Sequence, residues 1–206
     1  MTDGDPWTTA EEAQRMTAAL ARLARLAAPL PERRTARLLL RPFREEDRQP
    51  FAAMNADAEV AAFLPAALSR GESDALQDQI VADSARWGFG LFAVEEGSTG
   101  TFVGFVGLAV PAWQAHFTPV AEIAWRLARP AWGKGYATEA ARETLAWAFG
   151  PLDLPAIWSW TSPLNRRSWR VMQRLGMTRA GTFEHPRLPV GHVLREHVVY
   201  RLTRPS

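Results

Sequence analysis

Apolar residues recur at helical spacing near the start of the chain and at strand spacing through much of the rest. Met16, Leu20 and Leu23 repeat with a helical period after a capping-box pattern at residues 9–12. Two prolines, at positions 29 and 31, end the run. The pattern predicts a helical extension over residues 1–34, which either packs on its own domain or contributes to a dimer contact.

The remaining residues, 35–206, alternate between the two periods and predict one domain. Helices are expected at 44–62, 69–87, 136–149 and 165–175. Strands are expected at 38–43, 90–95, 101–108, 120–127, 156–161, 177–183 and 195–202. This order, βααβββαβαββ, predicts an α/β (α+β) fold with a mixed sheet of about seven strands and helices on its faces.

Two glycines, Gly133 and Gly135, lie where the strand pattern of 120–127 gives way to a helical pattern. A glycine-rich turn at a helix N-terminus offers free backbone N–H groups and a positive dipole end, which together suit a phosphate. The turn fits neither common nucleotide motif. A P-loop needs Ser or Thr directly after its Gly-Lys pair, but here Gly135 follows Lys134. A dinucleotide-binding loop needs a third glycine, and Thr138 stands at that position.

Composition narrows the class of protein. A chain of 206 residues with 47% hydrophobic content can bury one sizeable core. It has no apolar run long enough for a membrane span, no cysteine, and an acidic start without a signal-peptide pattern. We therefore expect a cytoplasmic protein without disulfides or thiolate metal sites.

Charge adds one further restriction. The formal net charge is only +2, so we expect no nucleic-acid partner. We expect no membrane partner either, because the chain has no long apolar run. Lys134 is the only lysine among 24 basic residues, and its position in the glycine turn places its ammonium near any bound phosphate.

Three motifs in order resemble the GNAT superfamily of acetyl-CoA-dependent N-acetyltransferases, and within it the ribosomal-protein N-terminal (Rim-type) branch. They are the segments 121–127, 132–140 and 165–177, and the resemblance covers roughly residues 35–203. One departure is Pro130, which stands where the family's pyrophosphate signature begins with Gln or Arg.

The resemblance implies a mostly antiparallel sheet that is splayed at the acetyl-CoA site, no metal, and a chain compatible with a homodimer. It also implies the residues that bind the cofactor, through backbone groups of the strand and the turn and through an asparagine. These are Ala124, Trp125, Arg126, Trp132, Gly133, Lys134, Gly135, Tyr136, Ala137 and Asn165.

Transfer of an acetyl group to an amine needs a base and an acid. Strand alternation places Glu122, Ala124 and Arg126 on one face, so Glu122 is the candidate base, with an ion pair to Arg126 as the alternative. The family places a proton donor for the leaving thiolate at Ser168. Asn165 and Ser168 equally suit the N-cap and N3 positions of a helix.

Other polar and aromatic residues carry weaker expectations. His185 and His192, in a loop that borders the acceptor site in this fold, either touch substrate, act as a second base in place of Glu122, or are solvent-exposed. Trp87, Trp113, Phe117 and Trp132 either line an acceptor groove or belong to the core. None of these residues shows metal-ligand spacing.

The function expected from the sequence is direct acetyl transfer to a primary amine, either a protein or peptide N-terminus or a small molecule. A peptide N-terminus and a small neutral amine rank first, because no acidic run points to a polycationic acceptor. A non-catalytic acyl-CoA-binding or regulatory domain is the alternative. A different acyl donor, such as succinyl-CoA, is a third option, since Arg126 could bind an acidic acyl tail.

Overall fold

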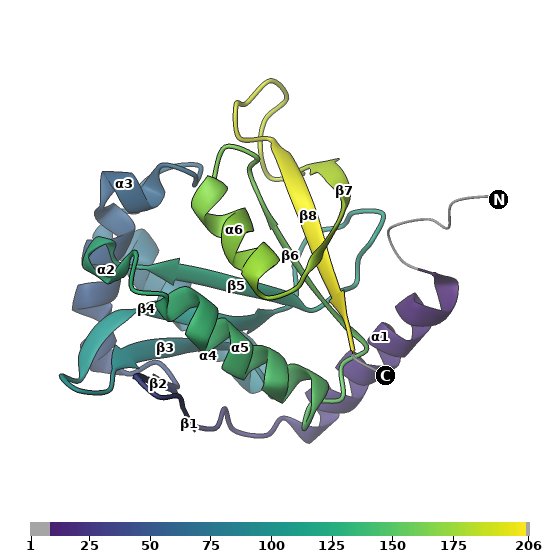
Figure 1. Ribbon diagram of the computed structural model, residues 1–206, viewed down its shortest axis with the longest axis horizontal. Helices are drawn as coiled ribbons and strands as arrows, with labels where there is room; N and C mark the ends of the chain where they lie inside the picture. Colours follow the sequence, from purple (N-terminus) through teal and green to yellow (C-terminus); the bar gives the residue numbers. More distant parts are fainter. Residues whose placement is uncertain (1–8, 205–206) are drawn as a thin grey trace.

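A computed structural model of the chain describes residues 9–204, and these residues form one sheet with helices on both faces (Figure 1). The strands are β1 (Arg33–Arg34), β2 (Leu38–Arg41), β3 (Leu91–Glu96), β4 (Thr101–Ala109), β5 (Glu122–Leu127), β6 (Ala156–Thr161), β7 (Thr178–Glu184) and β8 (Glu196–Thr203). Their order across the sheet is β1-β2-β3-β4-β5-β6-β8-β7. Every neighbouring pair is antiparallel except β5 and β6. The expected mixed, mostly antiparallel sheet is confirmed.

Helices lie on both faces of the sheet (Figure 1). They are α1 (Ala10–Leu26), α2 (Arg48–Ala56), α3 (Ala58–Ala61), α4 (Arg70–Trp87), α5 (Tyr136–Phe149) and α6 (Arg166–Arg174), with short 3-10 turns at Glu45–Asp47 and Arg129–Ala131. Ile123 and Val106 pack with α5 in the largest core cluster. Phe105 faces the opposite way and packs with residues of α2 and α4.

Two details differ from the sequence-based expectation. The sheet has an eighth strand, β1, because two arginines pair with Leu39 and Leu40 at its edge. The single helix expected at 44–62 is divided, because the Asp57 side chain accepts the N–H groups of Glu59 and Val60 and so caps a new turn.

The N-terminal helix α1 joins the main core. Met16, Leu20 and Leu23 are 3–4% exposed and belong to the largest core cluster. Arg22 also donates to the Leu152 carbonyl at 2.6 Å. The acidic start of the chain, residues 1–5, lies outside the described residues. Within residues 9–204, no helix is both long and apolar enough to cross a membrane.

The two halves of the sheet separate where β5 meets β6. These parallel strands share one register pair, Glu122 with Trp158, and Trp158 N–H donates to the Ala121 carbonyl at 3.0 Å. The Ser159 hydroxyl donates to the Ile123 carbonyl at 2.9 Å, and beyond this point the strands diverge (Figure 1). The second half of β5 therefore has an edge that no strand covers among the described residues.

Candidate active site

The glycine turn between β5 and α5 has the backbone geometry of an anion-binding site. Gly133 and Gly135 have φ values of 77° and 82°, a region that strongly favours glycine. Gly135 is the N-cap of α5, and its carbonyl accepts the Glu139 N–H at 3.0 Å. Within residues 9–204, no protein group accepts the N–H groups of residues 133–138. This turn presents a row of free donors at the positive end of a 14-residue helix.

Side chains anchor the turn on its outer side. Glu139, in the first turn of α5, accepts the Thr35 hydroxyl at 2.6 Å and forms an ion pair with Arg37 at 2.6 Å. The Tyr136 hydroxyl donates to Glu96 on β3. Because its acidic neighbours are engaged elsewhere, exposed Lys134 has no ion-pair partner in the described part of the chain. Its ammonium lies 5.6 Å from the centre of the Tyr136 ring.

The free edge of β5 presents the backbone of Trp125. The Ala128 N–H donates to Val103 on β4 at 2.9 Å, whereas the Leu127 carbonyl accepts the Trp132 indole N–H at 2.8 Å on the other side. Alternate residues of a strand direct their N–H and C=O groups to opposite edges. The N–H and C=O of Trp125 therefore point into the gap between β5 and β6, whereas those of Ala124 point to β4.

A cavity of about 1200 Å³ extends from the glycine turn along this edge of β5. Ten of the twelve residues expected at the site line it: Trp125, Arg126, Trp132, Gly133, Lys134, Gly135, Tyr136, Ala137, Asn165 and Ser168. Glu122 and Ala124 are not among its lining residues. The sequence motifs thus converge on one cavity. The candidate base, Glu122, does not line it.

The candidate base, Glu122, is half-buried at the point where β5 and β6 join. Its carboxyl group forms no hydrogen bond or ion pair with any described residue, so the alternative of an ion pair with Arg126 has no support in the structure. Burial raises the pKa of its carboxyl to about 8. A carboxyl with that pKa exchanges a proton near neutral pH, as a general base must.

Asn165 and Ser168 begin α6 on the other side of the gap. The Asn165 side-chain oxygen accepts the Ser168 N–H at 3.2 Å, so Asn165 is the N-cap of this helix. Half-buried Ser168 lines the cavity, and no described residue hydrogen-bonds its hydroxyl. The capping role of Asn165 leaves its amide nitrogen available to a ligand.

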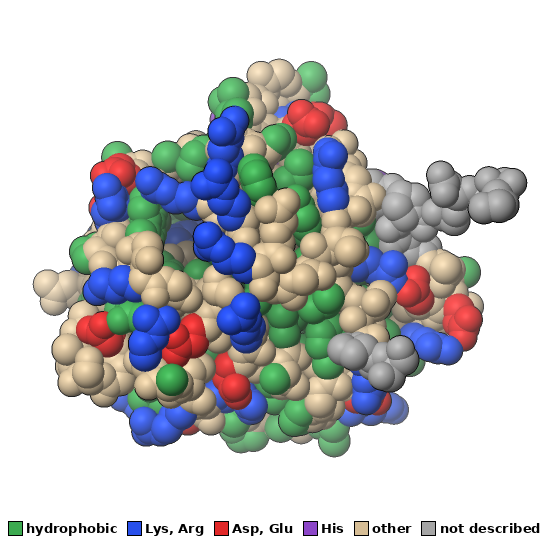
Figure 2. All heavy atoms as spheres, in the orientation of Figure 1, with side chains coloured by type: hydrophobic (Ala, Val, Ile, Leu, Met, Phe, Trp, Pro, Cys, Tyr) green, Lys and Arg blue, Asp and Glu red, His purple; other side chains and the backbone are tan. Residues whose placement is uncertain are grey.

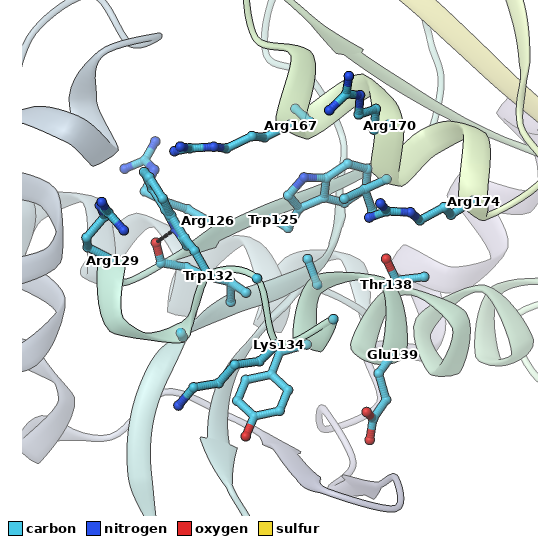
Figure 3. A pocket seen from close by; sticks show the side chains of 18 of the residues that line it. Trp125, Arg126, Arg129, Trp132, Lys134, Thr138, Glu139, Arg167, Arg170 and Arg174 are labelled. Carbon is cyan, nitrogen blue, oxygen red and sulfur yellow. Dashed lines mark hydrogen bonds between the residues drawn. The ribbon is translucent and has the colours of Figure 1, made fainter.

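Arginines form much of the cavity wall, which the sequence motifs did not indicate (Figures 2 and 3). The Trp132 ring lies between the guanidinium groups of Arg129 and Arg167, at 5.1 Å and 4.5 Å from its centre. Further basic residues line the wall from α5 and α6: Arg142, Arg170 and Arg174. The spacing of 167, 170 and 174 on one helix face is the signal that could have revealed them.

The histidines and most of the aromatic candidates lie away from the cavity. His185 and His192 are half-buried rather than exposed, and neither lines it. The His185 ring lies 4.9 Å from those of Trp113 and His197, and burial lowers its pKa to about 4. Trp113 and Phe117 pack in an aromatic cluster with Trp158 and Phe183. Trp87 packs against the main core, so Trp132 alone of these four aromatic residues lines the cavity.

Comparisons with known proteins agree with this geometry. A family profile described as "Acetyltransferase (GNAT) domain" matches residues 37–178. The chain is 32% identical over 158 residues to FsC-acetyl coenzyme A-N(2)-transacetylase of Aspergillus fumigatus, covering 74% of this chain and 67% of that protein. It is 35% identical over 104 residues to the uncharacterized protein YkkB of Bacillus subtilis. That match covers half of this chain and 59% of YkkB, less than two thirds of its length.

Solved structures share the fold. An acetyltransferase from Agrobacterium tumefaciens superimposes with a TM-score of 0.68 at 29% identity, over 84% of this chain and 94% of that one. A ribosomal-protein-S5-alanine acetyltransferase from Vibrio fischeri gives a TM-score of 0.68 at 17% identity, over 85% of this chain and 98% of that one. The second likeness is one of fold alone.

Proposed function

Because the chain belongs to the GNAT acetyltransferase family, whose members use acetyl-CoA, we propose that it transfers an acetyl group directly to a primary amine. One observation carries the proposal: a row of unpaired backbone N–H groups and an uncovered strand edge meet in a single cavity. The first feature suits a pyrophosphate and the second suits an extended amide-containing arm.

The residues present fit acetyl-CoA. The N–H groups of the turn at 133–138 would bind the pyrophosphate, with Lys134 close by. The backbone N–H and C=O of Trp125 and the Asn165 amide would pair with the pantetheine arm. Bound acetyl-CoA supplies an activated acetyl thioester, and every other requirement of the reaction falls to this chain.

In the reaction, a C–N bond forms to the acceptor amine and the C–S bond of the thioester breaks. The Trp125 N–H would stabilise the negative charge that develops on the carbonyl oxygen, a contribution of about 100-fold or more in rate. Glu122 would take a proton from the amine through water, since the carboxyl lies outside the cavity wall. Ser168 would donate a proton to the leaving sulfur and regain one from solvent, to which Glu122 would return the proton of the amine. The products are an amide and a free thiol.

The acceptor is a finer proposal. The motifs at 121–127, 132–140 and 165–177 support the Rim-type branch and hence a protein or peptide N-terminal amine. A small-molecule amine is the other candidate, and the name of the A. fumigatus relative describes acetyl transfer to an N(2) position in that protein. Both acceptors present a primary amine to the same strand edge.

Calorimetric titration with acetyl-CoA tests the proposal. We expect micromolar affinity in the wild type and none in Gly135→Asp, because the new carboxylate and the strained φ both oppose a phosphate at the turn. Gly100→Asp is the matched control, since Gly100 also has a positive φ (67°) but lies in the β3–β4 turn, outside the cavity lining.

The control variant should bind acetyl-CoA like the wild type. If the wild type binds neither acetyl-CoA nor succinyl-CoA, the chain is not an acyltransferase. Binding without turnover of any amine would instead favour the non-catalytic acyl-CoA-binding domain.

A further inference from the structure

The Arg126 side chain is held in a fixed position on β5. It pairs in register with Phe105 on β4, and its guanidinium carbon lies 5.4 Å from the centre of that ring. Its Nη1 donates to the Asn55 side-chain oxygen at 2.6 Å. Fully buried Asn55 in turn donates to the Ser73 hydroxyl at 2.9 Å, so α2 and α4 together orient the guanidinium.

No carboxylate neutralises this guanidinium in the described part of the chain. The contrast with other arginines is clear, because buried Arg41 pairs with both Asp47 and Glu95 and adjacent Arg129 pairs with Glu59 at 2.8 Å. Burial lowers the pKa of Arg126 to about 10, so the group still carries its charge at neutral pH. A largely desolvated charge without a counter-ion is costly, and an anionic ligand would relieve that cost.

The position of Arg126 shows which ligand could supply the anion. Its side chain lines the cavity but projects from the sheet face covered by α2, whereas the glycine turn leads into α5 on the opposite face. The phosphates of CoA, bound at the glycine turn, would therefore lie on the α5 side of β5, away from the Arg126 side chain. Arg126 also follows Trp125, whose N–H points to the reacting carbonyl in the proposed function. Figure 3 shows Arg126, Arg129 and Arg167 grouped at this end of the cavity around Trp132.

We propose that Arg126 binds a carboxylate of the acceptor, so that the acceptors are amines which also carry a carboxylate, as free amino acids do. The proposal rests on the proposed acetyl transfer. Of its two acceptor candidates it favours a small-molecule amine that carries a carboxylate over a peptide N-terminus, whose first residue has no free α-carboxylate. A planar guanidinium fixed by Asn55 can bind a carboxylate through two parallel hydrogen bonds. A carboxylate on the acyl donor would have the same chemistry, but the acetyl group used by this family has none.

The test compares acceptors that differ in the carboxylate alone. Each L-amino acid, its carboxamide and its decarboxylated amine is assayed with acetyl-CoA by thiol release. The wild type should acetylate at least one free amino acid with a kcat/KM about 10- to 100-fold above that of its carboxamide, as expected for hydrogen bonds to a charged group. In Arg126→Gln the ratio of acid to carboxamide should fall to about one.

Arg129→Gln is the matched control. Arg129 lines the same cavity and lies three residues away, but it is already paired with Glu59, so its loss should leave the acid-to-carboxamide ratio at the wild-type value. Arg126→Lys should restore part of the preference, because it keeps the charge and loses the planar pair of donors.

Four results would overturn the proposal. Two concern the acceptor: equal rates for acids and carboxamides, or no acetylation of any amino acid. The third is a preference for succinyl-CoA over acetyl-CoA as donor, which would place the carboxylate on the acyl group. The fourth is a loss of acetyl-CoA affinity in Arg126→Gln as large as the loss of acceptor preference. Calorimetry of the wild type with acetyl-CoA reports separately on the proposed function. Binding of acetyl-CoA without carboxylate selectivity would thus reject the inference alone.

Discussion

At the scale of single residues, glutamates of this chain differ in pKa and pairing because their surroundings differ. Three carboxylates on the cavity wall, Glu59, Glu139 and Glu143, each pair with an arginine. Glu122 pairs with none, and burial raises the pKa of its carboxyl to about 8. A carboxyl group that is unpaired and half-buried, on the strand whose free edge borders the cavity, is the best candidate for proton transfer in the proposed reaction.

This environment predicts a pH dependence. Glu122 accepts a proton only when ionised, so kcat at saturating substrates should rise with pH and level off above about pH 8. Glu122→Gln should lower kcat by about 100-fold or more and remove this rise. A rise that persists unchanged in Glu122→Gln would belong to the acceptor amine and would remove Glu122 from the mechanism.

The same pKa fixes the sign of an effect on stability. The folded chain holds the Glu122 proton up to about pH 8, whereas the unfolded chain loses it near the ordinary value of 4.5. The free energy of unfolding should therefore fall as pH rises between these values. In Glu122→Gln this contribution is absent, and denaturation at several pH values would reveal the difference from the wild type.

At the scale of elements, the helix α1 belongs to the core rather than to a separate surface. Leu20 is 4% exposed, whereas Leu26 at the end of the same helix is 65% exposed. Leu20→Ala should lower the free energy of unfolding by about 2–5 kcal/mol, and Leu26→Ala by less than about 0.5 kcal/mol. Urea denaturation measures both changes.

Protein concentration distinguishes the two expectations for α1. If the helix packs only within its own chain, the changes in unfolding free energy caused by Leu20→Ala and Leu26→Ala should not depend on protein concentration. A destabilisation by Leu26→Ala that varies with concentration would instead indicate that this helix contributes to a dimer.

The sequence predicted elements well where a local signal exists. The capping boxes at Thr9 and Ser69 mark the starts of α1 and α4, and the glycine turn marks the start of α5. It did not predict β1, because two arginines have no strand pattern and pair only once β2 is in place. It also missed the division at Asp57, since a capping side chain inside a helical pattern gives no change of period.

The features of the candidate site likewise fall into those that local sequence predicts and those that it does not. Backbone-based features, such as the turn at 133–135, follow from local sequence. The missing partner of Arg126 does not, because a charge is unpaired only relative to all elements packed around it. The sequence offered Glu122 as its neighbour on the strand face, but the structure places Asn55 of α2 against it instead.

At the scale of the whole molecule, the net charge is small although basic side chains are strongly concentrated around the cavity. The chain carries only +2, yet eight cationic and three acidic side chains line the cavity. Arginines that are scattered along the sequence, from Arg37 to Arg174, line this one cavity, and Figure 2 shows basic side chains gathered around the hollow. Such a concentration attracts anions over distances of about 10 Å at moderate salt.

Binding of a phosphorylated ligand should therefore depend on salt. We expect the affinity for acetyl-CoA to fall by about tenfold between 0.05 and 0.5 M NaCl, because screening weakens the attraction of the arginines for its phosphates. Acetyl-pantetheine, which lacks phosphates, should bind more weakly but with little salt dependence. Equal salt dependence for the two ligands would mean that the cavity arginines do not contact the phosphates.

The narrow junction between β5 and β6 also bears on how such a protein can diverge. Few hydrogen bonds cross it, so the strand ladder itself fixes the angle between the half-sheets only weakly. Substitutions that change this angle would reshape the cavity along β5. If the proposed function holds, this junction gives evolution a way to alter acceptor specificity within one fold.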